Sequence, residues 1–181
     1  MVGAGIDNHK DSQLIALQTF LERIDAKLKG IFMDRSYVIE NSQERERLRS
    51  LVSQMTDAEL SHPLGAGWTV GAALAHLAFW DQRSLVLLRK WKKDGVEASP
   101  VDVDVTNDAL LPLCLAIPPR VAANLAVFSA EVIDRELEES SSELIAHIES
   151  LGGRYRLYRS EHRKLHLDQI ELFIKTNQGE S

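Results

Sequence analysis

Apolar residues near the start of the chain recur at steps of three and four, which is the spacing of one face of an α-helix. These residues are Leu14, Leu17, Leu21, Ile24, Leu28 and Ile31. The pattern predicts an amphipathic helix over about residues 11–34, with an apolar seam close to the heptad period. Such a seam packs along a neighbouring helix or another subunit. We therefore expect residues 1–39 to form an N-terminal helical extension.

Helical periodicity returns in the rest of the chain and predicts the helices of a bundle. A brief apolar repeat at 48–55 is followed by a turn at 61–67, after which Thr69 occupies the position of an N-cap residue. Ser140 and Glu143 have the spacing of a capping box. Helices are expected over about 70–93, from Pro119 onward, over about 140–150 and over about 154–175.

The segment between the second and third of these helices reads as a long connection. Residues 94–118 contain one glycine and three prolines, and they predict a single short helix after Thr106. Strand-like alternation is confined to VDVDVT, residues 101–106. The chain is therefore predicted to be all-α, with a four-helix bundle over 40–176 in addition to the N-terminal helix.

Composition narrows the classes of partner. The chain has 181 residues, a length that fits one domain. Its formal charge is -6, so it lacks the excess of basic residues that is typical of nucleic-acid-binding proteins. No apolar run has the length of a membrane span, and the first residues do not have the pattern of a signal peptide. The single cysteine excludes an internal disulfide and suits a reducing compartment. We expect a cytoplasmic protein that binds neither nucleic acid nor membrane.

Three histidines have the spacing of a metal site. His162 and His166 are four residues apart in EHRKLHLDQ, so on a helix their imidazoles project from one face, with Cβ atoms about 6 Å apart. His76, in AHLAFWD on another predicted helix, is the candidate third ligand. Three imidazoles on one ion leave a coordination position for water or substrate. Function therefore depends on whether these three rings converge.

Helix phase predicts that the histidines face the interior. At 100° per residue, with Tyr158 at zero, His162 falls at about 40° and His166 at about 80°. The same arc contains Leu165, Gln169, Leu172 and Phe173, whereas Glu161, Lys164, Asp168, Glu171 and Lys175 lie opposite. The pair is thus expected in the middle of the core-facing stripe. His76 shares its own stripe with Ala73, Trp80, Leu87 and Trp91.

A buried imidazole without a partner costs about 1–3 kcal/mol, so either hydrogen bonds or a metal ion must satisfy these rings. Helix phase leaves both interpretations open. Gln169 lies on the histidine face and is the predicted hydrogen-bond partner of a ligand. His9, His62 and His147 have no partner at ligand spacing and are assigned no role.

The carboxylates nearest to the histidines in sequence are Asp81 and Glu161, and both are expected to project away from the histidine stripe. They are predicted to orient ligands or to pair with one of three arginines, Arg83, Arg159 and Arg163. Arg159 and Arg163 flank the histidine pair and could steer an anionic thiol or acid, although a solvated role is favoured for each. Cys114, in LLPLCLAIP, is predicted to be a packed core residue.

These motifs resemble the DinB-like superfamily, which includes bacillithiol transferases and the N-terminal domain of mycothiol-dependent maleylpyruvate isomerases. The resemblance lies in GWTVGAALAHLAFWD at 67–81 and HRKLHLDQIE at 162–171, and it spans roughly residues 40–175. Its pattern is a turn with Trp and Ser or Thr, a helix with the first histidine, and a last helix with two histidines and a glutamine. The matching positions are Trp68, Thr69, His76, His162, His166 and Gln169.

The resemblance implies a four-helix bundle, frequently a homodimer, with one divalent metal ion held by the three histidines. Imidazole ligands suit zinc or nickel without choosing between them. The expected function is a metal-dependent thiol S-transferase or isomerase that uses a low-molecular-weight thiol and an electrophilic substrate. The alternatives are a metal-dependent hydrolase on the same site and a non-catalytic helical protein. No individual catalytic residue is predicted.

Overall fold

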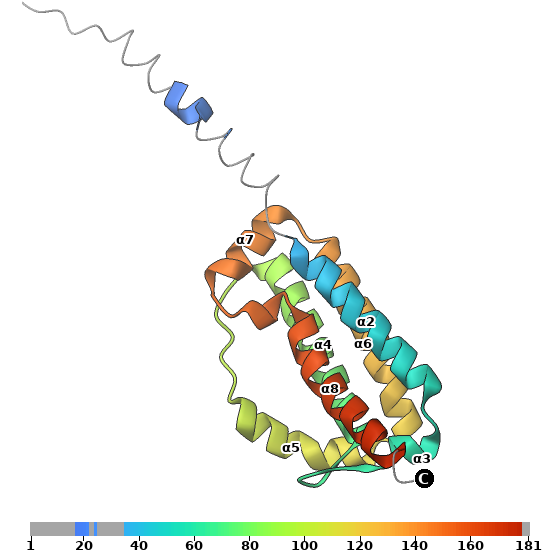
Figure 1. Ribbon diagram of the computed structural model, residues 1–181. Coiled ribbons are helices and arrows are strands. Elements are labelled where there is room, and N and C mark those ends of the chain that lie inside the picture. The colour runs from blue at the N-terminus through green and yellow to red at the C-terminus, as the bar shows by residue number, and fades with distance from the viewer. Residues whose placement is uncertain (1–16, 22–23, 25–34, 179–181) are drawn as a thin grey trace, which may run out of the picture. The chain divides into compact units, whose positions relative to one another are not determined.

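The computed structural model describes residues 17–21, 24 and 35–178 of the chain (Figure 1). The chain divides into two units, Met1–Asp34 and Arg35–Ser181. In the first unit, residues 17–21 and 24 are helical, and the remainder of the helix predicted over 11–34 lies outside the described residues. The candidate site and its supporting elements belong to the second unit.

Four long helices form the second unit, as the sequence predicted. Their contacts form a closed ring, because α4 packs against α6, α6 against α2, α2 against α8, and α8 against α4. These helices are α2 (Ser36–Gln54), α4 (Val70–Asp94), α6 (Pro119–Glu138) and α8 (Arg159–Gln178). The all-α bundle is therefore confirmed.

The direction of the helices explains the long connection between α4 and α6. Figure 1 shows α2 and α8 running one way along the bundle and α4 and α6 the other way. Since α4 and α6 are parallel, the chain must return along the whole bundle between them. It does so through an extended segment at 95–102 and the helix α5 (Val103–Ala116). This return segment covers one side of α4.

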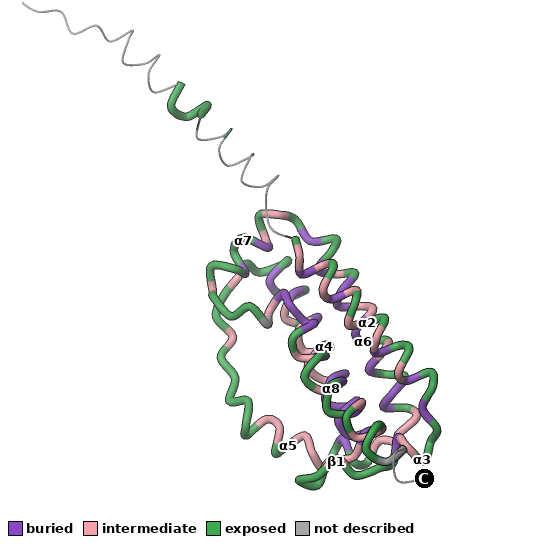
Figure 2. The backbone as a smooth tube through the Cα atoms, in the orientation of Figure 1, coloured by how far each residue is buried: buried purple, intermediate pink, exposed green. Residues whose placement is uncertain are grey.

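Small side chains bring α4 and α6 close together, and this is the most extensive helix contact of the bundle. The buried residues of α6 include a stripe of alanines, and α4 also buries alanines near its start. Figure 2 shows buried stretches along both helices. Larger apolar side chains from α2, α4 and α8 fill the remaining space, among them Leu48, Val52, Leu74, Leu77, Leu167 and Ile170. The core is thus continuous through all four helices.

Short elements connect the long helices. They are α3 (Asp57–Leu60), the hairpin strands β1 (Pro63–Gly65) and β2 (Trp68–Thr69), α7 (Ser142–Ser150) and the 3₁₀ turn η1 (Arg154–Arg156). The predicted turn at 61–67 is therefore part of a small antiparallel hairpin. None of the helices that the structure describes combines the length and the apolar character that a bilayer crossing requires.

Local capping chemistry decided several helix boundaries. The predicted N-cap at Thr69 is confirmed, because its Oγ1 accepts a hydrogen bond from the backbone N of Ala72 at 3.1 Å. The cap of α7 is one residue later than predicted, since Ser141 accepts from the N of Leu144. The strand-like alternation of residues 101–106 does not correspond to a strand in the structure. Asp102 instead caps α5 by accepting from the N of Val105, so that helix starts earlier than expected.

Candidate metal centre

The three predicted histidines converge at one point between α4 and α8. The ring centroids of His76 and His162 are 5.1 Å apart, and that of His166 is 4.9 Å from each of the other two. One ring nitrogen from each histidine lies within 4.8 Å of the others. The Nε2 atoms of His76 and His162 are 3.1 Å apart. The rings therefore form a compact triangle of nitrogen donors.

This geometry fits a single divalent ion. Two nitrogens bound to the same ion at about 2.1 Å are separated by roughly 3.0–3.4 Å when the angle at the ion is near 90–110°. The 3.1 Å separation of the two Nε2 atoms lies within that interval. In addition, the buried Nδ1 atoms of His76 and His166 have no hydrogen-bond partner among the described residues. Hydrogen bonds between described residues therefore leave one ring nitrogen of His76 and one of His166 without a partner.

Burial keeps the histidines neutral, which is the form that binds a metal. Desolvation lowers the pKa of His76 to about 4, with a smaller contribution from His166. Desolvation, followed by the positive charge of Arg159, lowers the pKa of His162 to about 2. The pKa of His166 is lowered by burial, while a hydrogen bond with Gln169 acts in the opposite direction. The predicted partner Gln169 thus interacts with His166, although Gln169 itself is exposed.

The predicted phase of α8 was wrong, although the histidines do meet. The buried stripe of α8 contains Ser160, Arg163, Leu167 and Ile170, whereas Leu165 is 57% exposed and Leu172 is 67% exposed. At 100° per residue, the centre of that stripe lies about 100° from the histidine pair. His162 and His166 are therefore half-buried at the flank of the core face. The error arose because the interpretation of the helix phase placed charged side chains in solvent, whereas one arginine of this helix is buried.

That arginine, Arg163, is the centre of a buried ionic network that the sequence did not reveal. It donates to Asp81 on α4 at 3.0 and 3.1 Å and to Asp134 on α6 at 2.8 and 2.9 Å. Arg159 donates to the other oxygen of Asp81 at 2.8 Å, and Arg45 of α2 donates to Asp134 at 3.1 Å. The expected pairing of Asp81 with Arg159 and Arg163 is thus correct. The solvated role favoured for the two arginines was wrong.

The network stabilises charged groups inside the bundle. Burial by itself lowers the pKa of Arg163, but the facing carboxylates of Asp81 and Asp134 more than offset this effect and keep the guanidinium charged. Burial raises the pKa of Asp134, and the positive charge of Arg163 opposes this. Because a buried charge is costly without a partner, the five side chains hold α2, α4, α6 and α8 in a defined register. That register positions His162 opposite His76.

Asn41 of α2 is a second feature that sequence analysis missed. Its Nδ2 donates to the backbone O of Leu157 at 2.8 Å, and its Oδ1 accepts from the backbone N of Ser160 at 2.8 Å. These bonds satisfy backbone groups where the chain leaves η1 and begins α8. The continuous helix predicted from residue 154 is interrupted at this point. Only the tertiary partner on α2 could have indicated the interruption.

Aromatic rings and α5 form the wall beside the histidines. The ring of Trp68 meets His76 edge to face at 5.4 Å, and the ring of Trp80 lies at 6.2 Å from His76. The indole Nε1 of Trp80 donates to Oδ1 of Asn107 at 3.2 Å. This bond ties α5 to α4 next to the histidine triangle. Asn107 had no sequence signal, because the segment that carries it was read mainly as a connection.

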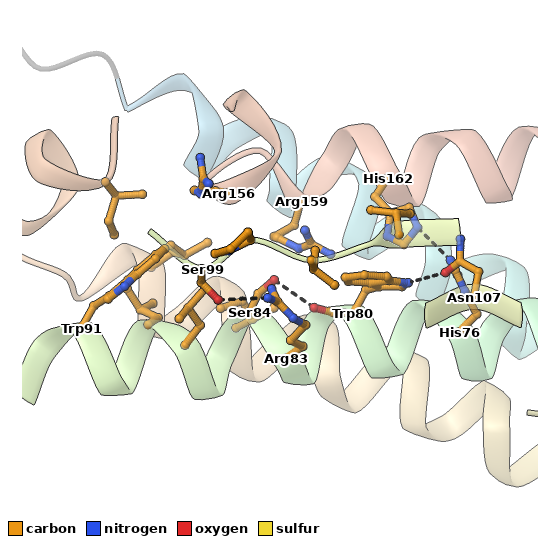
Figure 3. A pocket seen from close by; sticks show the side chains of 18 residues that line it. His76, Trp80, Arg83, Ser84, Trp91, Ser99, Asn107, Arg156, Arg159 and His162 are labelled. Atoms are coloured by element: carbon orange, nitrogen blue, oxygen red, sulfur yellow. Dashed lines mark hydrogen bonds between the residues drawn. The ribbon is translucent and has the colours of Figure 1, made fainter. Parts of the chain in front are cut away.

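A pocket of about 440 Å³ opens from the histidine triangle (Figure 3). His76 and His162 lie at one end of it and Trp91 at the other, with Trp80 beside the histidines. Its polar lining contains Arg83, Arg156 and Arg159, together with Ser84, Ser99 and Asn107. Among the described residues that line it there is no aspartate, glutamate, lysine, cysteine or tyrosine. Apart from the histidines and the hydroxyls of Ser84 and Ser99, the described lining therefore lacks a protein base or nucleophile.

The other predicted candidates lie elsewhere. Cys114 is buried in a cluster with Ala72 and Ala122, and burial raises the pKa of its thiol, so it is a packed residue as expected. Glu161 pairs with Arg154 at 2.7 Å on the surface. The ring of His62 contacts Phe173, with centroids 4.6 Å apart. His9 lies outside the described residues.

Comparison with known proteins identifies one related family. The model of the DinB superfamily matches residues 40–169 of the chain. The matched range includes all three converging histidines and Gln169. No match to a curated protein or to a solved structure was found.

Proposed function

This chain belongs to the DinB superfamily, and on that premise we propose that it is a metal-dependent enzyme that transfers or isomerises substrates with a low-molecular-weight thiol. His76, His162 and His166 would hold one divalent ion, zinc or nickel being the ions best suited to three neutral imidazoles. The observation that carries the proposal is the convergence of three histidine ring nitrogens beside a pocket that His76 and His162 line. A structural metal site would need no such opening.

The pocket lining favours an external nucleophile. A hydrolase of this kind is expected to use a carboxylate as general base, but none lines the described part of the pocket. Asp81, which follows His76 on α4, is 1% exposed and is engaged by Arg159 and Arg163. A thiol needs less assistance, since its pKa is much closer to neutrality than that of water. These features support the thiol reaction over hydrolysis.

A bound divalent ion would supply the positive charge that lowers the pKa of a thiol and converts it to the nucleophilic thiolate. The protein contributes the neutral histidines, the aromatic wall and a pocket that admits the second substrate. The thiolate sulfur would attack an electrophilic carbon and displace a leaving group. In an isomerisation it would add to an activated double bond and be eliminated after rotation about the resulting single bond.

Metal analysis tests the site. Protein purified without chelator or nickel resin is expected to contain one divalent ion per chain by elemental mass spectrometry. His76→Ala and His162→Ala are expected to abolish that content. His147→Ala is the matched control, because His147 is exposed on α7 and is not among the residues that line the pocket. Wild-type protein without metal, under conditions that preserve its fold, would contradict the proposal.

A turnover assay tests the reaction. The metal-loaded protein is incubated with 1-chloro-2,4-dinitrobenzene and, in separate samples, cysteine, glutathione or 2-mercaptoethanol. Product formation that requires both thiol and metal supports transfer. Release of product from ester substrates without any thiol would instead support the hydrolase alternative.

A further inference from the structure

Three arginines give the pocket a positive charge within an acidic protein. Arg83, Arg156 and Arg159 line it, and no acidic side chain is among its described lining residues. The chain as a whole has 27 acidic and 21 basic residues and a formal charge of -6. A concave site of one sign with apolar walls concentrates ligands of the opposite charge. The local excess of positive charge therefore points to an anionic occupant.

The arginines lie on the same side of the histidines along the pocket. In Figure 3, α4 and the segment leading into α8 run in opposite directions past each other. Arg83 is seven residues after His76, and Arg159 is three residues before His162. At 1.5 Å per residue, these separations correspond to about 10 Å and about 4.5 Å along the two helices. A molecule that reaches the histidines with one end therefore passes the arginines.

Arg159 belongs to the buried ionic network, in which its guanidinium pairs with Asp81 at 2.8 Å. Arg159 is only 4% exposed, so solvent screens its charge less than that of a surface residue. Arg159 is among the described residues that line the pocket, whereas Asp81 is not. The cationic member of this pair is thus the one that borders the pocket.

Neutral groups contact the other two guanidiniums. Arg83 donates to Oγ of Ser99 at 3.1 Å, and its guanidinium carbon lies 5.8 Å from the ring centre of Trp80. Arg156 donates to the backbone oxygens of Leu151 and Gly152. Such contacts help to orient a guanidinium. An orientation fixed before binding lowers the entropic cost of recognising a planar anion.

The rest of the wall is apolar. Side chains from α4, α6, α7 and the return segment line it, including Leu87, Trp91, Ile133 and Ile148. A volume of about 440 Å³ is in the range of sites for small organic molecules. A small inorganic anion would leave most of this apolar surface uncovered. The lining therefore matches an anion with a sizeable hydrocarbon body.

We propose that the pocket binds an organic carboxylate with an apolar body, its carboxylate directed to Arg83, Arg156 and Arg159. The apolar body contacts the walls between Trp80 and Trp91. This assignment rests on the proposed function in one respect, because it makes the carboxylate the second substrate of the thiol reaction. The assignment specifies the chemical class of the second substrate, which the thiol reaction by itself does not define.

Calorimetry with a matched pair of compounds tests the charge requirement. The probes are 4-phenylbutyrate and the neutral 4-phenylbutanamide, and each is titrated into metal-loaded and metal-free full-length protein. We expect both forms of the protein to bind the carboxylate at least about tenfold more tightly than the amide, as a charge-assisted hydrogen bond would give. Arg83→Met and Arg156→Met are each expected to remove most of this preference without weakening amide binding.

Arg89→Met is the matched control. Arg89 is exposed on the same helix as Arg83, pairs with Glu136, and is not among the residues that line the pocket. This variant is expected to retain the full carboxylate preference. Thermal unfolding of each variant shows whether it is folded. If one of the two pocket variants does not fold, the other still tests the proposal.

Three outcomes would overturn the proposal: equal affinities of the wild type for the two probes, no binding of either, or a preference that disappears when the metal is removed. The last result would mean that the carboxylate binds the ion instead of the arginines. Failure of the proposed function gives a different pattern. Protein that retains no metal and turns over no thiol, but still prefers the carboxylate, would retain the anion site and lose only its link to thiol chemistry.

Discussion

Oδ2 of Asp81 on α4 accepts hydrogen bonds from both Nε and Nη2 of Arg163 on α8, at 3.1 and 3.0 Å. The Arg163 side chain has no exposed surface. This pair puts a charged residue in the middle of the core-facing side of α8, and as a consequence the two histidines of that helix lie on its flank. There they meet His76, and His162 borders a pocket. The ionic pair therefore determines where the candidate site opens.

Replacement of Arg163 by methionine is expected to lower the free energy of unfolding by about 3–5 kcal/mol, because it leaves Asp81 and Asp134 buried with fewer partners. Urea denaturation followed by circular dichroism measures the change. Arg89→Met, which breaks the exposed pair with Glu136, is the control and should cost less than about 1 kcal/mol. Equal effects of the two substitutions would contradict a special role of the buried pair.

Acidification is expected to destabilise the metal-free protein. The pKa of His76 is lowered to about 4 in the folded state, whereas an unfolded histidine has a pKa of about 6.5. As the pH falls below 6.5, the unfolded state takes up a proton that the folded state does not. Stability is thus fully present above pH 6.5 and decreases toward pH 4, at up to about 1.4 kcal/mol per pH unit for each such histidine.

Urea midpoints recorded between pH 7.5 and 4.5 in the presence of a chelator measure this slope. His76→Phe removes one of the titrating groups while keeping a ring in the wall. The slope of this variant should be shallower than that of the wild type over the same interval. Parallel curves for the two proteins would show that His76 does not contribute.

Gly71→Ala is expected to destabilise the bundle at the start of α4. A Cβ atom at this position would lie 2.9 Å from Cβ and 3.0 Å from Cα of Pro119, and 3.2 Å from the backbone O of Leu60. Relieving these contacts requires a shift of α4 against α6, at a cost of about 1–3 kcal/mol. This outweighs the gain in helix propensity of about 1 kcal/mol. A thermal midpoint above that of the wild type would argue against close packing here.

The N-cap of α4 offers a test of the helix that carries His76. Thr69→Ala removes the acceptor for the backbone N of Ala72 and should cost about 1 kcal/mol. Thr69→Ser retains the hydroxyl and should be close to neutral. Thermal unfolding monitored by circular dichroism compares the two variants. Similar losses for alanine and serine would mean that the methyl group, and not the cap, is important.

The helical bundle and the identity of the three histidines followed from the chain by local reasoning. Periodicity predicted the long helices, and the spacing of His162 and His166 placed both rings on one side of α8 whatever the phase of that helix. Thr69 was recognisable as a cap because capping depends on residues next to each other in sequence. These features share a short range along the chain, which is why they were predictable.

Only the tertiary structure decided which way α8 faces and what surrounds its histidines. A helical wheel ranks side chains by polarity, so it places Arg163 in solvent, whereas two carboxylates from α4 and α6 make its burial favourable. Asn41 and Asn107 acquired their roles through partners more than 25 residues away in the chain. The pocket likewise exists because the return segment, which includes α5, lies against α4. Long-range pairing of polar groups leaves no periodic trace in the sequence, and here it determined the surroundings of the site.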